Sequence, residues 1–340
     1  MKFIVPNSLK QGDTIGFISP SSGPTQLAIH RVEKAKKELE HLGYRVRIAS
    51  HALNSNGYVS DSIENRISDI HDLFSDDSVR AIMCTIGGNN SNQLLQHLDY
   101  SLIKNHPKIF IGYSDITVLH YALLSQANLA TYYGPCAMIQ FGEFPLIFDY
   151  TLRYFQSEII DDKLRTNAYK IFSSDEWTDE FLDWLKKDDL TRARTLKKNK
   201  GYEWLREGIG EGSAIGGAIL SINHLAGTKY WIDPKDSIFF LDILQEINLL
   251  NESAVDALLA DLFNMGVFDS LNGLVISRPA GYTKDETIRL KEMIKRYTST
   301  SKKKYPILFN ANIGHTDPII TIRYGRNMLL DSSMNLFMAK

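Results

Sequence analysis

Short apolar runs alternate with segments of helical periodicity between residues 13 and 125. The first run, residues 13–19, ends in the turn cluster Pro20-Ser21-Ser22-Gly23, and apolar residues then recur on one face of a predicted helix that ends at Gly43. The same order of strand, turn and helix repeats along the chain. Strands separated by helices of this length are typical of a mostly parallel sheet with both faces covered.

The periodicity places the elements of the first half as strands at 44–48, 80–86 and 108–112 and helices at 28–42, 63–74, 91–98 and 116–125. The fold class is therefore α/β, with an N-terminal, Rossmann- or flavodoxin-like, mostly parallel sheet flanked by helices. Ligands bind outside the carboxyl ends of strands in such sheets. The turns that follow two of the strands, after residues 86 and 112, are the first candidates for a functional site.

A second unit begins near Ser213. Its predicted elements are strands at 238–241 and 273–277, helices at 255–263 and 286–297, and a hairpin formed by 319–324 and 328–338 around Gly325-Arg326-Asn327. This pattern predicts a C-terminal mixed α/β domain with a β-rich end.

A chain of 340 residues is long for one hydrophobic core, because cores stop growing near ~250–300 residues. We predict an N-terminal domain at 1–165, a connecting segment at 166–210 and a C-terminal domain at 211–340. The connecting segment is polar but carries Trp177, Trp184 and Trp204, three of the four tryptophans of the chain. Each indole could anchor the segment by hydrophobic contact or could contact a substrate.

The bulk composition excludes several classes of partner. Lys and Arg number 38 against 40 Asp and Glu, so no overall positive field favours nucleic acid. Cys84 and Cys136 have no metal-ligand spacing, and no run approaches the ~18 apolar residues of a membrane span. We expect a cytoplasmic protein without metal, cofactor, nucleic-acid partner or membrane association.

Ser114 stands at a turn between a strand and a helix in Gly112-Tyr113-Ser114-Asp115-Ile116. This position would hold its hydroxyl above the sheet edge, with helix N-terminal amides, including that of Asp115, close to an oxyanion. The segment departs from the full G-x-S-x-G elbow because Ile116 occupies its last position. Ser114 is therefore a candidate nucleophile or, on the alternative interpretation, a helix N-cap.

A glycine turn follows the preceding strand at the same predicted edge. Gly87 and Gly88 let the backbone approach a ligand, and their amides could bind a carboxylate or an oxyanion. Asn89 and Asn90 follow directly. The alternative interpretation is a tight turn that Ser91 or an asparagine caps.

His315 is the histidine that a loop could aim at a substrate, since Gly314-His315-Thr316-Asp317-Pro318 lies between strands. An acid that orients it could be Asp317 in the same loop or could come from the end of the strand 238–241, where both Asp242 and Glu246 are candidates. Each carboxylate could equally cap or solvate its loop.

These segments together resemble the LD-carboxypeptidase family, and particularly its microcin-C self-immunity branch, over nearly the whole chain. The resemblance rests on the following segments in the family's order: Leu9-Lys10-Gln11-Gly12-Asp13-Thr14, Gly87-Gly88-Asn89-Asn90-Ser91, Pro107-Lys108-Ile109-Phe110-Ile111-Gly112-Tyr113-Ser114-Asp115, Tyr133-Gly134-Pro135, Glu211-Gly212-Ser213-Ala214-Ile215-Gly216-Gly217, Leu225-Ala226-Gly227-Thr228 and Gly314-His315-Thr316-Asp317-Pro318.

The resemblance implies a serine peptidase. In it Ser114 is the nucleophile, His315 the general base, and the amides of Gly88 and Asp115 form the oxyanion hole. The family's acid is usually a glutamate directly after the apolar strand, where this chain has Asp242, and we favour Asp242 over Glu246. The family also tends to have asparagine where this chain has Ala218.

The resemblance also implies the substrate class and the assembly. The substrate is either the amide of a peptidyl- or aminoacyl-nucleotide or the L,D-amide of a murein tetrapeptide that releases D-alanine. We favour the nucleotide, with Gly87, Asn89 and the three tryptophans as substrate-binding residues, because an indole can stack on a base. The family precedent suggests a homodimer.

Two rival classes remain to be weighed. The departures at Asp242 and Ala218 are also compatible with a ligand-binding homologue that has lost catalysis. A glutamine-amidotransferase-like protein would need a cysteine at the elbow, where this chain has Ser114.

Overall fold

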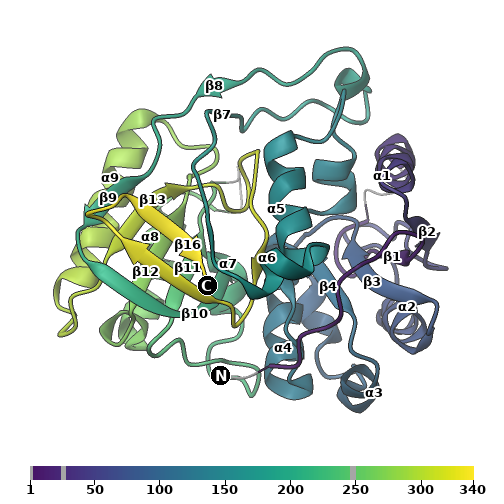
Figure 1. Cartoon of the computed structure of the whole chain (residues 1–340), viewed down its shortest axis with the longest axis horizontal. Coiled ribbons are helices and arrows are strands. Elements are labelled where there is room, and N and C mark those ends of the chain that lie inside the picture. The colour runs from purple at the N-terminus through teal and green to yellow at the C-terminus, as the bar shows by residue number, and fades with distance from the viewer. Residues whose placement is uncertain (1–2, 24–27, 246–249) are drawn as a thin grey trace.

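The computed structural model describes residues 3–23, 28–245 and 250–340. Two sheets lie side by side in Figure 1, one built from the purple, blue and teal first half of the chain and the other from its green and yellow second half. The α/β fold class predicted from the periodicity is confirmed, with a mostly parallel first sheet and a mixed second one.

The first sheet has the strand order β14-β5-β4-β3-β1-β2. The strands from β5 to β2 pair in parallel, and β14 pairs antiparallel with β5 at the edge. Its strands are β1 (Thr14–Ile18), β2 (Arg45–Ile48), β3 (Val79–Cys84), β4 (Ile109–Gly112), β5 (Tyr132–Tyr133) and β14 (Ile322–Arg323). The helices of this half are α1 (Ile29–His41), α2 (Ile63–Ser75), α3 (Tyr100–Asn105), α4 (Thr117–Ala127), α5 (Asp149–Ile159) and α6 (Asp162–Thr166).

Alternate residues of the buried strands enter two different cores. In β4, Ile109 and Ile111 pack with α1 and α5, whereas Phe110 packs in the core that contains α2 and α4. Successive side chains of a strand point to opposite faces, so the uninterrupted apolar run of β4 covers both. This is why β4 has no alternating polar pattern, unlike the edge strand β2, in which exposed arginines alternate with partly buried apolar side chains.

The second sheet has the order β6-β16-β15-β10-β11-β12-β13-β9. The four strands from β10 to β13 are parallel, and the flanking strands pair antiparallel. Its strands are β6 (Tyr169–Lys170), β9 (Glu203–Arg206), β10 (Ile209–Ala218), β11 (Ile238–Asp242), β12 (Gly273–Ser277), β13 (Ile307–Ala311), β15 (Asn327–Asp331) and β16 (Leu336–Ala339). Helices α7 (Ile219–Asn223), α8 (Glu252–Asn264) and α9 (Lys284–Ser299) belong to this half.

One buried cluster runs through both halves, since it contains Phe110 of the first sheet and Phe240 and Ile276 of the second. The carboxyl ends of β4 and β11 therefore meet over continuous packing. The domain boundaries at 165 and 211 stay a prediction.

The predicted helix at 91–98 is wrong, because only Ser91–Leu94 is helical and forms a 3-10 turn. The carbonyl of Leu95 accepts hydrogen bonds from the hydroxyls of Tyr100 and Tyr230, at 2.6 and 2.9 Å. The hydroxyls of Tyr100, on the following helix α3, and of Tyr230, from the second half of the chain, thus occupy an acceptor that a continuing helix would use.

The predicted tail hairpin is also wrong in its first strand. Residues Ile322–Arg323 form β14 and join the first sheet, while β15 and β16 make the hairpin. The amide of Tyr324 donates to Thr131 and that of Gly325 to Ala214, so consecutive residues bind different sheets. Gly325 has φ +77°, a conformation that glycine adopts at low cost and that turns the chain between them.

The connecting segment supplies strands at both edges of the second sheet. Strand β6 pairs with β16 and β9 with β13, while β7 (Glu176–Trp177) pairs with β8 (Lys197–Lys198) in a separate ribbon, which crosses the top of Figure 1. Both ends of the connecting segment are therefore tied to the second sheet by backbone hydrogen bonds.

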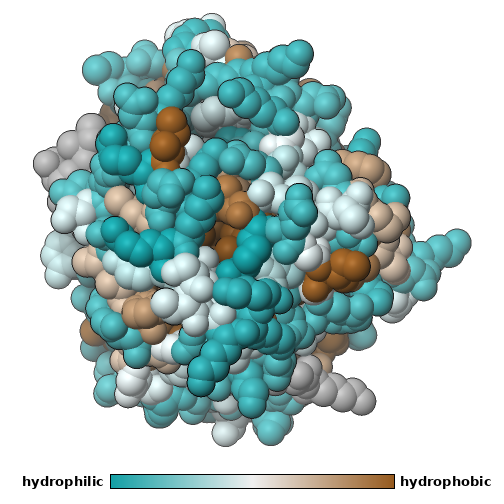
Figure 2. Space-filling model, turned by 90° about the vertical axis from the view of Figure 1, so that its left-hand side faces the viewer, coloured by the Kyte–Doolittle hydropathy of each residue, from teal (hydrophilic) through white to brown (hydrophobic). Residues whose placement is uncertain are grey.

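The face shown in Figure 2 carries small brown patches separated by teal, hydrophilic residues. Scattered apolar side chains of this kind are ordinary on a protein surface. In the described part of the chain, every helix is too short or too polar to cross a bilayer.

Candidate active site

Ser114 occupies a strained turn at the end of β4. Its φ is 65°, in the left-handed region that a residue with a side chain rarely adopts. The turn opens the short 3-10 segment Ser114–Ile116, and α4 follows. A Cβ on Gly87 would lie 2.9 Å from the Cβ of Ser114, so the glycine turn packs directly against the serine. The arrangement is the strand-to-helix elbow that exposes a hydroxyl at a sheet edge.

The imidazole of His315 meets the Ser114 hydroxyl. Nε2 of His315 lies 3.0 Å from Oγ of Ser114, although 201 positions separate them in the chain. The ring of Tyr113 packs edge-on against the imidazole, with centroids 5.2 Å apart. The two side chains are therefore at the hydrogen-bonding distance that the sequence led us to expect.

The other imidazole nitrogen faces Asp242 at the end of β11. Nδ1 of His315 lies 2.8 Å from Oδ2 of Asp242, and the backbone amide of His315 donates to Oδ1 at 3.4 Å. The Asp242 side chain is fully buried. Glu246, the alternative acid, lies outside the described residues.

Gly314 explains how the short aspartate side chain fits. Its φ is +77°, and a Cβ at this position would overlap the Asp242 carboxylate. The carboxylate thus packs against the bare Cα of the residue next to His315. Aspartate is one methylene shorter than glutamate, and it still reaches the imidazole because the backbone at Gly314 lies close to the Asp242 carboxylate.

Tyr133 is a residue that the sequence did not single out for chemistry. Its hydroxyl donates to Oδ2 of Asp242 at 2.5 Å and accepts the backbone N–H of Ser114 at 3.3 Å. Burial, and then the charge of Asp242, raises the pKa of Tyr133 well above its usual value, so the hydroxyl stays protonated and can donate. The Tyr133-Gly134-Pro135 segment carries family resemblance, but no local pattern indicates its partners.

The side chain of Asp115 points away from the reacting hydroxyl. Its Oδ2 accepts from the Ser21 hydroxyl at 2.5 Å and from the Ser91 amide at 2.8 Å. These bonds tie the elbow to the loop after β1 and to the glycine turn. Gly88 has φ +146°, and a Cβ there would overlap Ser21 and Ser22, so only glycine fits.

The structure brings together Ser114, His315 and Asp242, with Gly87 beside the serine and Gly88 against Ser21 and Ser22. Asn89 is exposed in the same turn. Ala218 lies opposite Asp242 at the ends of β10 and β11, and its amide donates to the Thr117 hydroxyl at 3.1 Å.

The three tryptophans have partners outside this group. Lys197 and Arg278 flank the Trp177 ring at 4.6 and 5.1 Å, and the guanidinium of Arg31 lies 4.5 Å from the Trp184 ring. Trp204 lies in β9 and donates to Asn335 at 2.9 Å. Of the three, Trp177 lies next to a residue that contacts residues 314–318, the histidine loop: its neighbour Thr178 exchanges backbone hydrogen bonds with Asp317.

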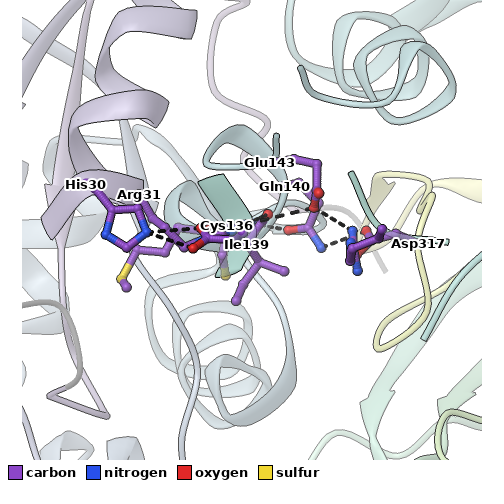
Figure 3. Close-up of polar contacts among 10 residues, drawn as sticks. His30, Arg31, Cys136, Ile139, Gln140, Glu143 and Asp317 are labelled. Carbon is purple, nitrogen blue, oxygen red and sulfur yellow. Dashed lines mark hydrogen bonds and ion pairs between the residues drawn. The ribbon is translucent and has the colours of Figure 1, made fainter. Parts of the chain in front are cut away.

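A buried network of charged and polar side chains binds the Asp317 carboxylate of the loop that carries His315 (Figure 3). Arg194 pairs with Glu143 at 2.6 Å and with Asp317 at 2.7 Å, and Gln140 donates to the other Asp317 oxygen at 3.1 Å. Burial raises the pKa of Glu143, although the nearby Arg194 opposes that rise. The network fixes the loop two residues beyond His315.

A second buried ion pair ties the connecting segment, which supplies Arg194, to α1. Arg31 donates to Asp189 at 2.7 Å, and His30 lies 3.0 Å from the same carboxylate. Residues 188–194 therefore connect the first helix with the loop that carries His315.

The described residues hold no group of three or more His, Cys, Asp and Glu side chains that could bind a metal ion. Cys84 and Cys136 are buried free thiols. The chemistry available at the site is that of a hydroxyl, an imidazole and a carboxylate in sequence: a nucleophile, a base and a group that orients the base.

Two family models match the chain. The model for the LD-carboxypeptidase N-terminal domain matches residues 15–134, and the model for the C-terminal domain matches residues 211–330.

Curated relatives cover the chain almost completely. YocD of Bacillus subtilis (strain 168), whose name places it among the carboxypeptidases, is 37% identical over 94% of this chain and 93% of its own. The Microcin C7 self-immunity protein MccF of Escherichia coli is 29% identical over 95% and 92%. A second Bacillus subtilis (strain 168) protein, named "Probable murein peptide carboxypeptidase", is 27% identical over 96% and 92%.

Solved structures agree in fold over the same extent. An MccF-like protein from Bacillus anthracis str. Ames superposes with a TM-score of 0.87 at 34% identity, covering 99% of this chain and 98% of its own. MccF in complex with aspartyl sulfamoyl adenosine superposes with a TM-score of 0.88 at 27% identity and the same coverage.

Proposed function

The chain belongs to the LD-carboxypeptidase family, and we propose that it is a serine peptidase with Ser114 as nucleophile, His315 as general base and Asp242 as the orienting acid. One observation carries the proposal: the contacts of 3.0 Å from Ser114 to His315 and of 2.8 Å from His315 to Asp242. This order of groups lets the imidazole take a proton from the hydroxyl while the carboxylate holds its tautomer.

The proposed reaction is acyl transfer to water. His315 removes the Ser114 proton as Oγ attacks the amide carbonyl, and the resulting imidazolium protonates the leaving nitrogen as the C–N bond breaks. Water, deprotonated by the same imidazole, then hydrolyses the acyl-enzyme and restores the serine. The buried Asp242 stabilises the positive imidazolium in both halves of the cycle.

The oxyanion hole is proposed at the amides of Gly88 and Asp115. The Asp115 side chain is bound by Ser21 and the Ser91 amide, which fixes the turn that presents its N–H. Donors that are already oriented need no reorganisation energy as negative charge develops on the oxygen. Loss of one such donor typically lowers kcat by ~10²–10³-fold.

For the substrate we propose the amide of a peptidyl- or aminoacyl-nucleotide. The support is that a relative with the same fold over 99% of this chain binds aspartyl sulfamoyl adenosine. We place the indole of Trp177 at the substrate, because its neighbour Thr178 pairs with Asp317 in the loop that carries His315. The contacts of Trp184 with Arg31 and of Trp204 with Asn335 are accounted for by the alternative interpretation, in which they anchor the connecting segment.

A murein tetrapeptide is the second candidate substrate, because a relative named for murein peptide cleavage covers 96% of this chain. Hydrolysis of a murein tetrapeptide and of an aminoacyl-sulfamoyl adenosine, measured side by side with the purified protein, separates the two. Release of D-alanine with no cleavage of the nucleotide would reverse our preference.

Labelling with a fluorophosphonate probe tests the nucleophile. We expect covalent labelling of the wild-type protein, none in Ser114→Ala and a sharp decrease in His315→Ala. Ser125→Ala, an exposed serine on α4, serves as the control and should label normally.

Absence of labelling and of turnover in the wild-type protein, together with retained binding of the nucleotide analogue, would instead support the non-catalytic ligand-binding protein.

A further inference from the structure

Tyr133 lies where the two sheets meet. It ends β5 of the first sheet, whereas Asp242 ends β11 of the second, and the two positions are 109 residues apart in the chain. Its hydroxyl donates to Asp242 and accepts the amide of Ser114. A single oxygen therefore contacts the strained backbone of one candidate catalytic residue and the carboxylate of another.

The tyrosine ring has little freedom to move. Its side chain is 1% exposed, and its ring packs against Tyr113, His120 and Phe240 with centroid distances of 6.2, 6.2 and 5.3 Å. Close packing on three sides fixes the position of the hydroxyl.

Burial favours the neutral form of several titratable groups around this hydroxyl. Burial lowers the pKa of His120 to about 3 and raises that of Cys136 to about 12. It also raises the pKa values of Tyr113 and Tyr324 well above their usual range. Asp317, which faces Tyr113, is paired with Arg194.

We propose that Tyr133 is a positioning residue that holds the nucleophile turn and the acid in register across the two sheets; the inference rests on the proposed function. Oδ2 of Asp242 is shared between the Tyr133 hydroxyl and Nδ1 of His315. The tyrosine thus sets both where the carboxylate lies and how much of its negative charge faces the imidazole.

Tyr133→Phe tests this role, because it removes one oxygen and keeps the ring. We expect kcat/KM to fall ~10–100-fold, the range of a lost hydrogen bond to a charged group, mostly through kcat. We also expect the acid limb of the pH–rate profile to move up by about 0.5–1 pH unit. Without the tyrosine donor, more carboxylate charge faces the imidazole and favours its protonated, inactive form.

Tyr132→Phe is the matched control. Tyr132 is the neighbouring residue of β5, is also fully buried, and its hydroxyl accepts a hydrogen bond from Arg165 instead of contacting the site. The control should leave the acid limb in place. An unmoved limb in Tyr133→Phe, or an equal loss of turnover in both variants, overturns the inference.

A second variant covers the case in which Tyr133→Phe does not fold. Incorporation of 3-fluorotyrosine at position 133 keeps the hydroxyl and makes it a stronger donor, so the acid limb should move to lower pH. No movement overturns the inference. A wild-type protein that neither reacts with a fluorophosphonate nor hydrolyses either substrate would overturn the proposed function itself, whereas normal wild-type activity with unaltered variants refutes Tyr133 alone.

Discussion

The carboxylate of Asp242 accepts hydrogen bonds from three donors: the Tyr133 hydroxyl, Nδ1–H of His315 and the His315 backbone amide. A buried charge is tolerated when each lone pair has such a partner. The shorter acid of this chain is thus accommodated by neighbours that close around it, and Gly314 is the neighbour with the least room for change.

Gly314→Ala should displace the histidine loop. The added methyl group would overlap the Asp242 carboxylate, so we expect a lower melting temperature and a loss of turnover of at least ~10²-fold. Measurement of both quantities on the purified variant checks this.

Gly227→Ala provides the comparison for Gly314→Ala. Gly227 has φ +72°, close to the +77° of Gly314, but a Cβ there would have no atom within 4 Å. This variant carries the backbone strain alone, on the order of 1–2 kcal/mol. Equal activity losses in the two variants would contradict the carboxylate clash.

At the scale of elements, the connecting segment has a positional role in the site. It supplies Arg194 to the Asp317 carboxylate and Thr178 to the Asp317 backbone. Most charged side chains of this segment are exposed, but Asp189 and Arg194 are paired inside the molecule and tie the segment to α1 and to the loop of His315.

Arg194→Gln should loosen the histidine loop. The substitution removes the Arg194 cation from the buried Asp317 and leaves Glu143 with the more distant Arg31, at 3.8 Å; breaking a buried pair in this way typically costs about 3–5 kcal/mol. We expect lower stability in urea and a reduced kcat.

Arg192→Gln is the control two residues away, since Arg192 pairs with Glu180 at the exposed surface. It should change neither stability nor turnover measurably. Equal behaviour of the two variants would show that the buried network does not support the site.

At the scale of the whole molecule, His120 lies in the shared core between the sheets. Its Nε2–H donates to the carbonyl of Gly112 at 3.0 Å, and its ring packs against Phe110, Tyr133 and Tyr324. Burial lowers its pKa from 6.5 to about 3. The folded protein therefore keeps this histidine neutral where the unfolded chain would protonate it.

Acid should destabilise the protein partly through this residue. A lowered folded-state pKa contributes stability that is complete above pH 6.5 and is lost progressively as the pH falls towards 3. The raised pKa values of the buried Glu143 and Glu158 act in the opposite direction, since protonation favours the fold there. Substitution of His120 therefore separates its contribution to the pH dependence of stability from that of the two glutamates.

We expect His120→Gln to flatten the decline of the melting temperature between pH 7 and pH 5 relative to the wild-type protein. His224→Gln, which changes an exposed histidine, should leave the decline unaltered. An unchanged slope in His120→Gln would contradict the assignment.

Local patterns were sufficient to make Ser114 and His315 candidates, whereas the roles proposed for them rest on the family resemblance. Ser114 is marked by a turn between a strand and a helix, and His315 by a loop between strands. Tyr133 and Gly314 act on Asp242 from 109 and 72 positions away, and neither local spacing nor composition encodes such a contact. The same limit explains the misplaced strand at the tail, because its partner in the first sheet is β5, at Tyr132–Tyr133, far earlier in the chain.

By itself, the sequence determined the parallel α/β architecture of the first half and the identities of the two principal candidates, because periodicity and turn chemistry act over a few residues. Only the tertiary structure decided which acid lies at the imidazole, which tyrosine joins the sheets and which segments close the second sheet. Those outcomes depend on packing between residues far apart in the chain, where burial and hydrogen-bond pairing are settled only once the two sheets share one core.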